Sequence, residues 1–171
     1  PYSYMEYIVT MLGVPCFFVH GNHDHPEYLS SGRVLKEPGG WIDLDGRSCE
    51  KRGVLLAGLE GSIRYKPEAA YQYTERQMAW KAWSLVPTLL MNRINHGRYL
   101  DILVTHSPPR GHVDVSSRGE RLGSRAVLET VERARRRLVV CGHIHHSWGR
   151  ESRVGPTRIV NAGPDGVVAE V

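Results

Sequence analysis

Long apolar runs are missing from this sequence of 171 residues, and cysteine is scarce. No run approaches the roughly 20 apolar residues that a membrane-spanning helix requires, and there is no charged-then-apolar signal segment at the front. The three cysteines, Cys16, Cys49 and Cys141, are scattered and odd in number, which argues against a disulfide framework and suits a reducing compartment. We therefore predict a cytoplasmic protein that does not enter a membrane.

Charge of one sign is only slightly in excess. The formal net charge is +4, and arginine supplies most of the basic surplus. Such a balance fits an anionic partner such as a phosphate compound, but the arginine run at 133–137 is typical of a solvated helix end. Charge alone is therefore weak support for nucleic-acid binding, and it leaves a homo-oligomer open.

Histidine, by contrast, is plentiful. Seven of the nine histidines fall in three short stretches, each of which follows an apolar run: His23, His25, His106, His112, His143, His145 and His146. Imidazole is the commonest side-chain ligand for metal ions in proteins. The clustering therefore predicts a metal site.

Apolar runs and helix signals alternate along the chain, which predicts the α/β class in a single domain over residues 1–171. Residues 74–85 open with Thr74 and Gln77 in capping-box spacing, and Trp80 and Trp83 are typical of helix packing. Further helices are predicted at 3–13, beyond Pro87 and at 124–136. Strands are predicted at 15–20, 52–62, 99–106 and 137–141. We also predict one hairpin strand within 39–46, and two strands around a glycine-rich turn in 157–171. Because ligands bind beyond the carboxyl ends of strands in such sheets, the three histidine clusters are expected to share one site.

Three motifs stand at these strand ends in a fixed order. They are "GNHD" at 21–24, "THSPP" at 105–109 and "GHIH" at 142–145. Together they resemble the last three sequence blocks of the calcineurin-like metallophosphoesterase superfamily, from about residue 14 to the end. The resemblance implies a four-layer α/β/β/α sandwich of two mixed sheets that hydrolyses phosphate esters.

The resemblance also implies a role for each matched residue. Asn22, His106 and His143 would bind one metal of a two-metal pair, and His145 would bind the other. His23 would stay off the metals beside the scissile phosphate, and Asp24 would hydrogen-bond His23 and hold its ring. Family members usually carry manganese, iron or zinc.

The chemistry of the residues agrees with these roles. Imidazole nitrogen and amide oxygen suit Mn, Fe or Zn. In "GHIH" the two histidines alternate with one residue, so on an extended segment they would point to the same side and serve neighbouring metals. A bridging hydroxide would attack phosphorus, and His23 as general acid would contribute roughly 10²–10⁴-fold in rate.

Other polar residues beside these motifs have weaker claims. Arg110 and His112 are candidate substrate-binding residues, because a guanidinium reaches phosphate oxygens readily. Two roles stay open for three further residues, namely contact with the substrate or capping of a loop. These residues are His25, His146 and Asp114. Cys141 lies in an apolar strand and is expected to be inert core.

Two earlier blocks of the superfamily pattern are missing from this sequence. It contains no Asp-x-His and no Gly-Asp dipeptide, and those blocks would supply most ligands of the first metal and the bridging carboxylate. Three neutral ligands bind a dication weakly, so this chain alone is expected to hold one metal ion or none. We expect an N-terminally truncated domain that lacks its first strands; the alternative is a natural short form that takes the ligands from a partner.

The sequence thus predicts a metal-dependent phosphoesterase that acts on a small phosphorylated substrate, with a phosphodiester slightly favoured over a monoester. Two alternatives stay open. One is a non-catalytic or metal-deficient scaffold of the same fold, and the other is a nuclease with a basic, aromatic-lined groove.

Overall fold

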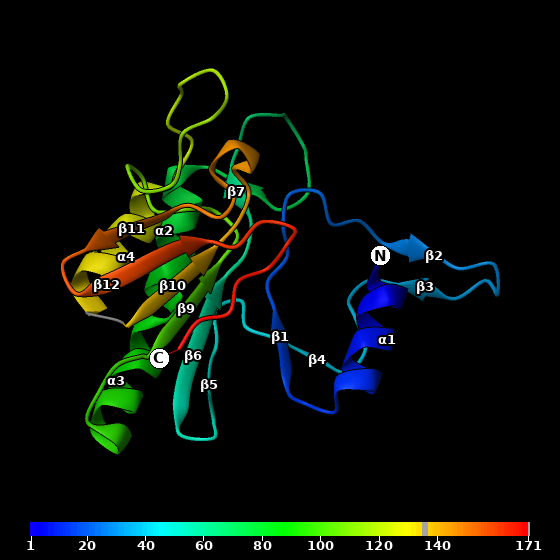
Figure 1. Cartoon of the computed structure of the whole chain (residues 1–171), viewed down its shortest axis with the longest axis horizontal. Helices are drawn as coiled ribbons and strands as arrows, with labels where there is room; N and C mark the ends of the chain where they lie inside the picture. Colours follow the sequence, from blue (N-terminus) through cyan, green and yellow to red (C-terminus); the bar gives the residue numbers. More distant parts are fainter. Residues whose placement is uncertain (135–136, 171) are drawn as a thin grey trace.

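A mixed sheet of six strands forms the centre of the protein (Figure 1). The computed structural model describes residues 1–134 and 137–170. The strand order is β11-β12-β10-β9-β6-β5, in which β6, β9, β10 and β12 run parallel and the two edge strands run antiparallel to their neighbours. The bounds are β5 Ser48–Lys51, β6 Val54–Leu59, β9 Ile102–Thr105, β10 Leu138–Cys141, β11 Glu151–Val154 and β12 Thr157–Asn161.

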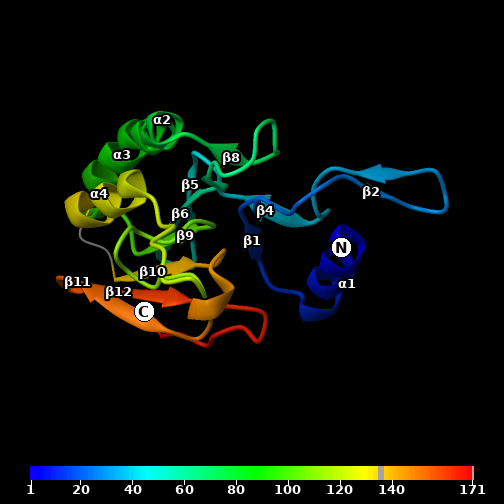
Figure 2. The same ribbon diagram turned by 90° about the horizontal axis from the view of Figure 1, so that it is seen from above.

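Three helices cover one face of this sheet (Figure 2). They are α2 Glu75–Ser84, α3 Val86–His96 and α4 Arg125–Ala134. The predicted capping box is confirmed, because the Thr74 hydroxyl accepts from the backbone of Gln77 while the Gln77 side chain accepts from the backbone of Thr74. The last two residues of the predicted helix 124–136 lie outside the described residues.

The core lies between these helices and the sheet. Parallel strands that are buried on both faces read as continuous apolar runs, and Leu103 and Val139 of the central strands are completely buried. Val127 and Val131 of α4 enter the same cluster, as their shared helix face predicts. Trp80 and Trp83 do not pack here, contrary to expectation, since both side chains are exposed.

A second, smaller sheet and a fourth helix lie on the other side. Strand β1 (Cys16–Phe18) pairs in parallel with β4 (Trp41–Asp43), and α1 (Tyr2–Leu12) lies outside this pair, ending at the left-handed Gly13. Figure 2 shows the resulting order of helices, main sheet, small sheet and helix. The predicted four-layer α/β/β/α sandwich is therefore confirmed, with the second sheet reduced to two strands among the described residues.

The remaining strands form short pairs beside the two sheets. Strands β2 (Glu27–Tyr28) and β3 (Val34–Leu35) are antiparallel, and β7 (Ser62–Ile63) runs parallel to β8 (Gln72–Tyr73). Every described helix is too short or too polar to pass through a lipid bilayer.

Two predictions of local pairing were wrong. The segment 39–46 is not half of a hairpin, because β4 pairs with β1 across a long connection; the hairpin is β5–β6. In 157–170 only β12 forms, and its antiparallel partner is the preceding β11. In both cases the turn residues were recognised, but the choice of partner strand depends on the sheet as a whole.

Candidate metal centre

The residues of the three motifs meet where β1, β9 and β10 end. His106 directly follows β9, and His143 comes two residues after its parallel neighbour β10. Asn22 arrives from the other sheet, four residues beyond β1. Because parallel strands end at the same edge, the fold itself brings the motifs together.

Three side-chain atoms converge on one point. The Oδ1 atom of Asn22 lies 2.7 Å from Nε2 of His106 and 2.9 Å from Nδ1 of His143. The Nδ2 group of Asn22 donates to the hydroxyl of Tyr65 at 2.7 Å, which fixes the orientation of the amide. The centroids of the two imidazole rings are 5.0 Å apart.

The backbone around these residues is specialised. His143 has a φ of 66°, a left-handed conformation that is uncommon outside glycine and often marks functional sites. The Nδ2 group of the buried Asn161 donates to the carbonyls of Gly142 and Ile144 and thereby holds this turn. Gly21 lets the His106 ring approach the backbone, because a Cβ there would lie 2.6 Å from Cε1 of that ring and would displace it.

Burial sets the protonation of the two histidines. It lowers the pKa of His106 to about 3, with smaller contributions from His143, His23 and His145. Burial likewise lowers the pKa of His143 to about 4, helped by His23 and His145. Both rings are therefore neutral at neutral pH, the state that a metal ligand requires.

His145 lies apart from this hydrogen-bonded group. The predicted extended geometry of "GHIH" is wrong, since His143 is left-handed and a 3₁₀ turn, η1, begins at His145 (His145–Ser147). The His145 ring instead packs on Trp148, with centroids 4.4 Å apart. It still lines the same cavity as His143.

His23 is exposed and lines that cavity as well. No hydrogen bond joins Asp24 to His23 in the described part of the chain, although the motif predicts one. The Asp24 carboxylate accepts from the backbone N–H of Gly21 at 2.6 Å, and the Asp24 N–H donates back to the Gly21 carbonyl at 3.1 Å. Asp24 therefore holds the shape of the loop, because a short polar side chain readily closes such a turn.

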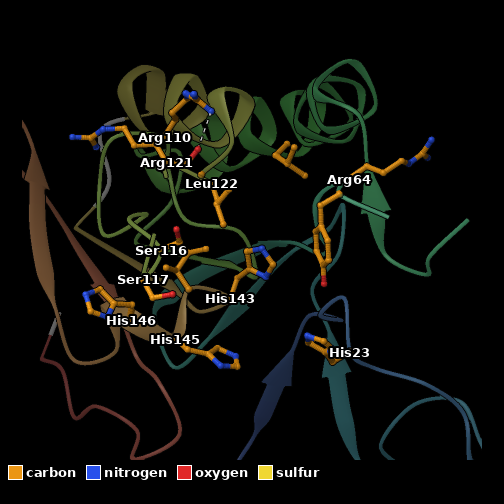
Figure 3. A pocket seen from close by; sticks show the side chains of 14 residues that line it. His23, Arg64, Arg110, Ser116, Ser117, Arg121, Leu122, His143, His145 and His146 are labelled. Carbon is orange, nitrogen blue, oxygen red and sulfur yellow. Dashed lines mark hydrogen bonds between the residues drawn. The ribbon is translucent and has the colours of Figure 1, made fainter. Parts of the chain in front are cut away.

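A cavity of about 520 Å³ opens beside the histidines. Figure 3 shows His143 pointing into it, with His145 and His23 along one side, and Arg64 extending away. Arg110 lines the wall, where its Nη1 group donates to the Arg121 carbonyl at 3.4 Å. His112, two positions further along the same loop, is not among the described residues that line this space.

Asp114 anchors the loop that forms this wall. Its buried carboxylate accepts from the backbone N–H groups of Gly111 and Gly123 and from Nη1 of Arg121. A buried carboxylate with three donors is well satisfied. This residue is therefore explained by loop structure rather than by contact with a ligand.

The residues fit a single divalent ion in donor type and protonation, through an amide oxygen and two neutral imidazoles. Among the described residues no cluster of three or more His, Cys, Asp or Glu side chains is arranged to hold a metal. The donor set at Asn22 therefore lacks a carboxylate partner, and the charge of a dication would stay uncompensated.

Sequence reasoning missed Tyr65 and the role of Asn161. Tyr65 comes from the loop after β7 and carries no motif signal. Asn161 stands at the end of β12, in the stretch "NAGP", so its place after an apolar run was a usable signal. Polar residues at the carboxyl ends of strands were the signal for the other site residues, and the same signal would have indicated Asn161.

A sandwich of two sheets between helices, with amide and imidazole groups meeting at its strand ends, defines a metallophosphoesterase-type protein. The profile of the calcineurin-like phosphoesterase family matches residues 1–147, and the chain belongs to this family. Membership confirms the resemblance seen in the motifs and supports a phosphoesterase-type function. Members generally bind divalent metal ions.

Curated relatives and a solved structure agree. The chain is 33% identical over 124 residues to the UPF0046 protein T07D4.2 of Caenorhabditis elegans, covering 70% of this chain and 28% of that protein. It is 38% identical over 88 residues to the human metallophosphoesterase domain-containing protein 1, covering 50% and 24%. The chain thus spans about a quarter of the length of these relatives. The crystal structure of TT1561 of Thermus thermophilus superposes with a TM-score of 0.59 at 18% identity, covering 95% of this chain and 68% of that one, which shows the shared fold.

Proposed function

We propose that this chain contributes to a metal-dependent phosphoesterase that hydrolyses a small phosphorylated substrate, preferentially a phosphodiester. The observation that carries the proposal is the convergence of Asn22, His106 and His143 within 2.7–2.9 Å beside an open cavity. Neutral, buried imidazoles next to an amide oxygen have little use in a core but suit a metal of the Mn, Fe or Zn type.

In this proposal Asn22, His106 and His143 hold one ion, and His145 reaches a second from across the cavity. When bound, such a metal pair activates water and neutralises charge on the phosphoryl oxygens. Among the described residues no carboxylate joins the three atoms at Asn22 in a metal-holding cluster, so in this proposal polypeptide outside these 171 residues would supply the carboxylate ligands of the pair.

His23 supplies the proton to the departing oxygen. Its exposed ring lines the cavity without being tied to Asn22, so it is free to meet a substrate there. Asp24 positions His23 indirectly, because its bond to Gly21 sets the course of the loop. Arg110 contacts the phosphate side of the substrate from the opposite wall, a use that suits its planar fork.

The size of the cavity supports a small substrate. A volume of about 520 Å³ matches the range of small-molecule sites, roughly 300–1,000 Å³. We propose that the substrate is a free phosphate compound rather than a nucleic acid.

A second candidate is a binding module of the same fold with little activity. The neutral donor set favours it, since weak metal binding would leave the phosphate unactivated. In this case the cavity would bind an anionic group without cleaving it.

Metal titration combined with an activity assay tests the proposal. Calorimetry with Mn²⁺ and Zn²⁺ should detect one main binding event in this chain, lost in His143→Ala and retained in the matched control His25→Ala. Hydrolysis of a bis(nitrophenyl) phosphate should then be measured on a protein extended to the length of the relatives. Tight metal binding without hydrolysis by that longer protein would favour the binding module, and absence of metal binding by the same longer protein would refute both the centre and the enzyme.

A further inference from the structure

Helices α2 and α3 form one nearly continuous rod on the outside of the molecule (Figure 1). Leu85 connects them with helical dihedrals of φ −75° and ψ −22°, and Pro87 stands in the first turn of α3, where a missing N–H is tolerated. Side-chain faces therefore continue from one helix into the next.

The inner face of this rod is buried in the core. Met78 and Leu85 are fully buried, and Leu89 nearly so. Their spacing of seven and four residues is that of one helix stripe. This face satisfies the packing that an amphipathic surface helix needs.

The outer face is apolar as well. Exposed apolar side chains recur along it at Trp80, Trp83, Leu90 and Ile94, with Met91 beside them. The spacings of three, seven and four residues follow an a/d heptad pattern, the signature of a seam between helices. Trp80 is 76% exposed and Ile94 74%, so nothing in the described structure covers this stripe.

Hollows flank the stripe. One of about 400 Å³ is lined by Arg76, Ala79, Trp80 and Trp83. A smaller one, of about 80 Å³, lies on the other side of Trp83 toward α4. Ridges of large side chains next to hollows are the surface that a docked helix uses.

The charges around the stripe that no counter-charge balances are of one sign. Glu129 lines the smaller hollow, but its carboxylate pairs with Nη2 of Arg133 at 3.3 Å. The Glu75 carboxylate is not available to a partner, because it accepts hydrogen bonds from the backbone N–H groups of Arg125 and Ala126 at the start of α4. Lys81 turns inward to Asp45 and Glu60. Arg76 and Arg93 form no ion pair with any described residue, and the Arg93 guanidinium lies 5.9 Å from the centroid of the Tyr99 ring. The charge beside the apolar stripe that no carboxylate balances is therefore positive.

We propose that the outer face of α2 and α3 is a docking surface for an acidic amphipathic helix of a partner protein. The partner helix presents apolar residues at heptad spacing to Trp80, Trp83, Leu90 and Ile94, and its flanking carboxylates meet Arg76 and Arg93. Buried tryptophan and arginine side chains are the residues that most often dominate such interfaces.

The charge pattern favours this occupant over two others. A second copy of the chain would place unpaired arginines against arginines across the seam, and like charges at an interface are unfavourable. An anionic membrane would also attract the arginines, but the heptad periodicity and the paired hollows match a helix rather than a fluid surface.

Binding of designed peptides to the whole chain tests the proposal. Two labelled three-heptad peptides carry the same leucine seam, one flanked by glutamates and the other by lysines. Fluorescence anisotropy should show that the glutamate peptide binds at least about tenfold more tightly, with the difference shrinking as salt rises. Trp80→Ala and Ile94→Ser should each weaken that binding, whereas Tyr28→Ser, a change at an exposed apolar residue of β2, should not.

Each alternative has its own result. Equal affinity for both peptides, or equal loss in Tyr28→Ser, would overturn the assignment of an acidic partner. Dimerisation in sedimentation that Ile94→Ser abolishes, without peptide binding, would assign the face to a second copy. Binding to phosphatidylserine vesicles that Trp80→Ala abolishes, again without peptide binding, would assign it to a membrane.

Discussion

The side-chain oxygen of Asn22 lies 2.7 Å from Nε2 of His106, although the two residues are 84 positions apart in the sequence. The same oxygen accepts from Nδ1 of His143. Since Nδ2 of Asn22 is committed to Tyr65, both rings must carry their protons toward the oxygen in the metal-free chain. Metal binding through these nitrogens therefore requires each ring to break its hydrogen bond to Asn22 and to move its proton to the other ring nitrogen.

The neutral donor set leads to the first prediction. Asn22→Asp should raise the affinity for divalent metal by about tenfold or more, because each added carboxylate ligand offsets charge on a hard cation. The Tyr65 hydroxyl can turn to donate to the new carboxylate, so the side chain keeps its place. Calorimetric titration with Mn²⁺ measures the effect, with Asn22→Ala as the variant that should bind more weakly than the wild type. An unchanged affinity in Asn22→Asp would show that this oxygen is not a ligand.

A second prediction concerns the close contact between Gly21 and His106. In Gly21→Ala the new Cβ would meet the imidazole at 2.6 Å, so the ring must move. Overpacking of this kind costs about 1–3 kcal/mol of unfolding free energy, and metal affinity should fall with it. Chemical denaturation and metal titration give the two values.

Gly142→Ala is the matched control for this change. Gly142 belongs to the same site, but a Cβ there meets nothing within 4 Å, and its backbone is not left-handed. It should leave both stability and metal affinity nearly unchanged. If both variants behave alike, the effect belongs to the loop sequence rather than to the His106 ring.

Much of this site could be predicted from the sequence, for a physical reason. Each motif directly follows an apolar run, and the carboxyl ends of parallel strands share an edge, so local order along the chain translates into proximity in space. Asn22, His106 and His143 were found in this way. Tyr65 could not be found, because it arrives from an irregular loop whose position depends on the completed fold.

Other errors have the same origin in long-range packing. The pairing of β1 with β4 is set by the layers on either side, which turn residues near Asp45 do not encode. The Asp24 carboxylate accepts a hydrogen bond from the backbone N–H of Gly21 rather than from the His23 ring. Trp80 and Trp83 look like core residues by composition, but their side of the helix faces outward.

The low pKa values of His106 and His143 predict a pH-dependent stability in the metal-free chain. Burial lowers both pKa values below the ordinary 6.5, to about 3 and about 4, so the unfolded chain binds more protons than the folded one in between. The stabilisation is complete above pH 6.5 and is lost as the pH falls toward the folded values. The limiting slope is about 1.4 kcal/mol per pH unit for each ring.

Urea denaturation in the presence of a chelator, at several pH values between about 7.5 and 5, measures this slope. His106→Gln removes one of the two rings and should flatten the dependence in that window. The same change at the exposed His25 should leave the slope as it is. A slope that His106→Gln does not alter would assign the pH dependence to other groups.

The last prediction separates the roles of His23 and His143, both of which line the cavity. His23 is exposed and outside the hydrogen-bonded group at Asn22, so His23→Ala in the catalytically complete protein should reduce turnover roughly 10²–10⁴-fold as a general acid would while leaving the metal content unchanged. His143→Ala should lower both, because its ring belongs to the metal donor set. Metal content by plasma mass spectrometry, alongside the rate of phosphodiester hydrolysis, distinguishes the two variants. The effect of His23→Ala should also be smaller for a substrate whose leaving group has a low pKa, since such an oxygen departs without a proton. Equal loss of metal and activity in both variants would show that His23 is a ligand, and the proton donor would then have to be sought elsewhere along the cavity.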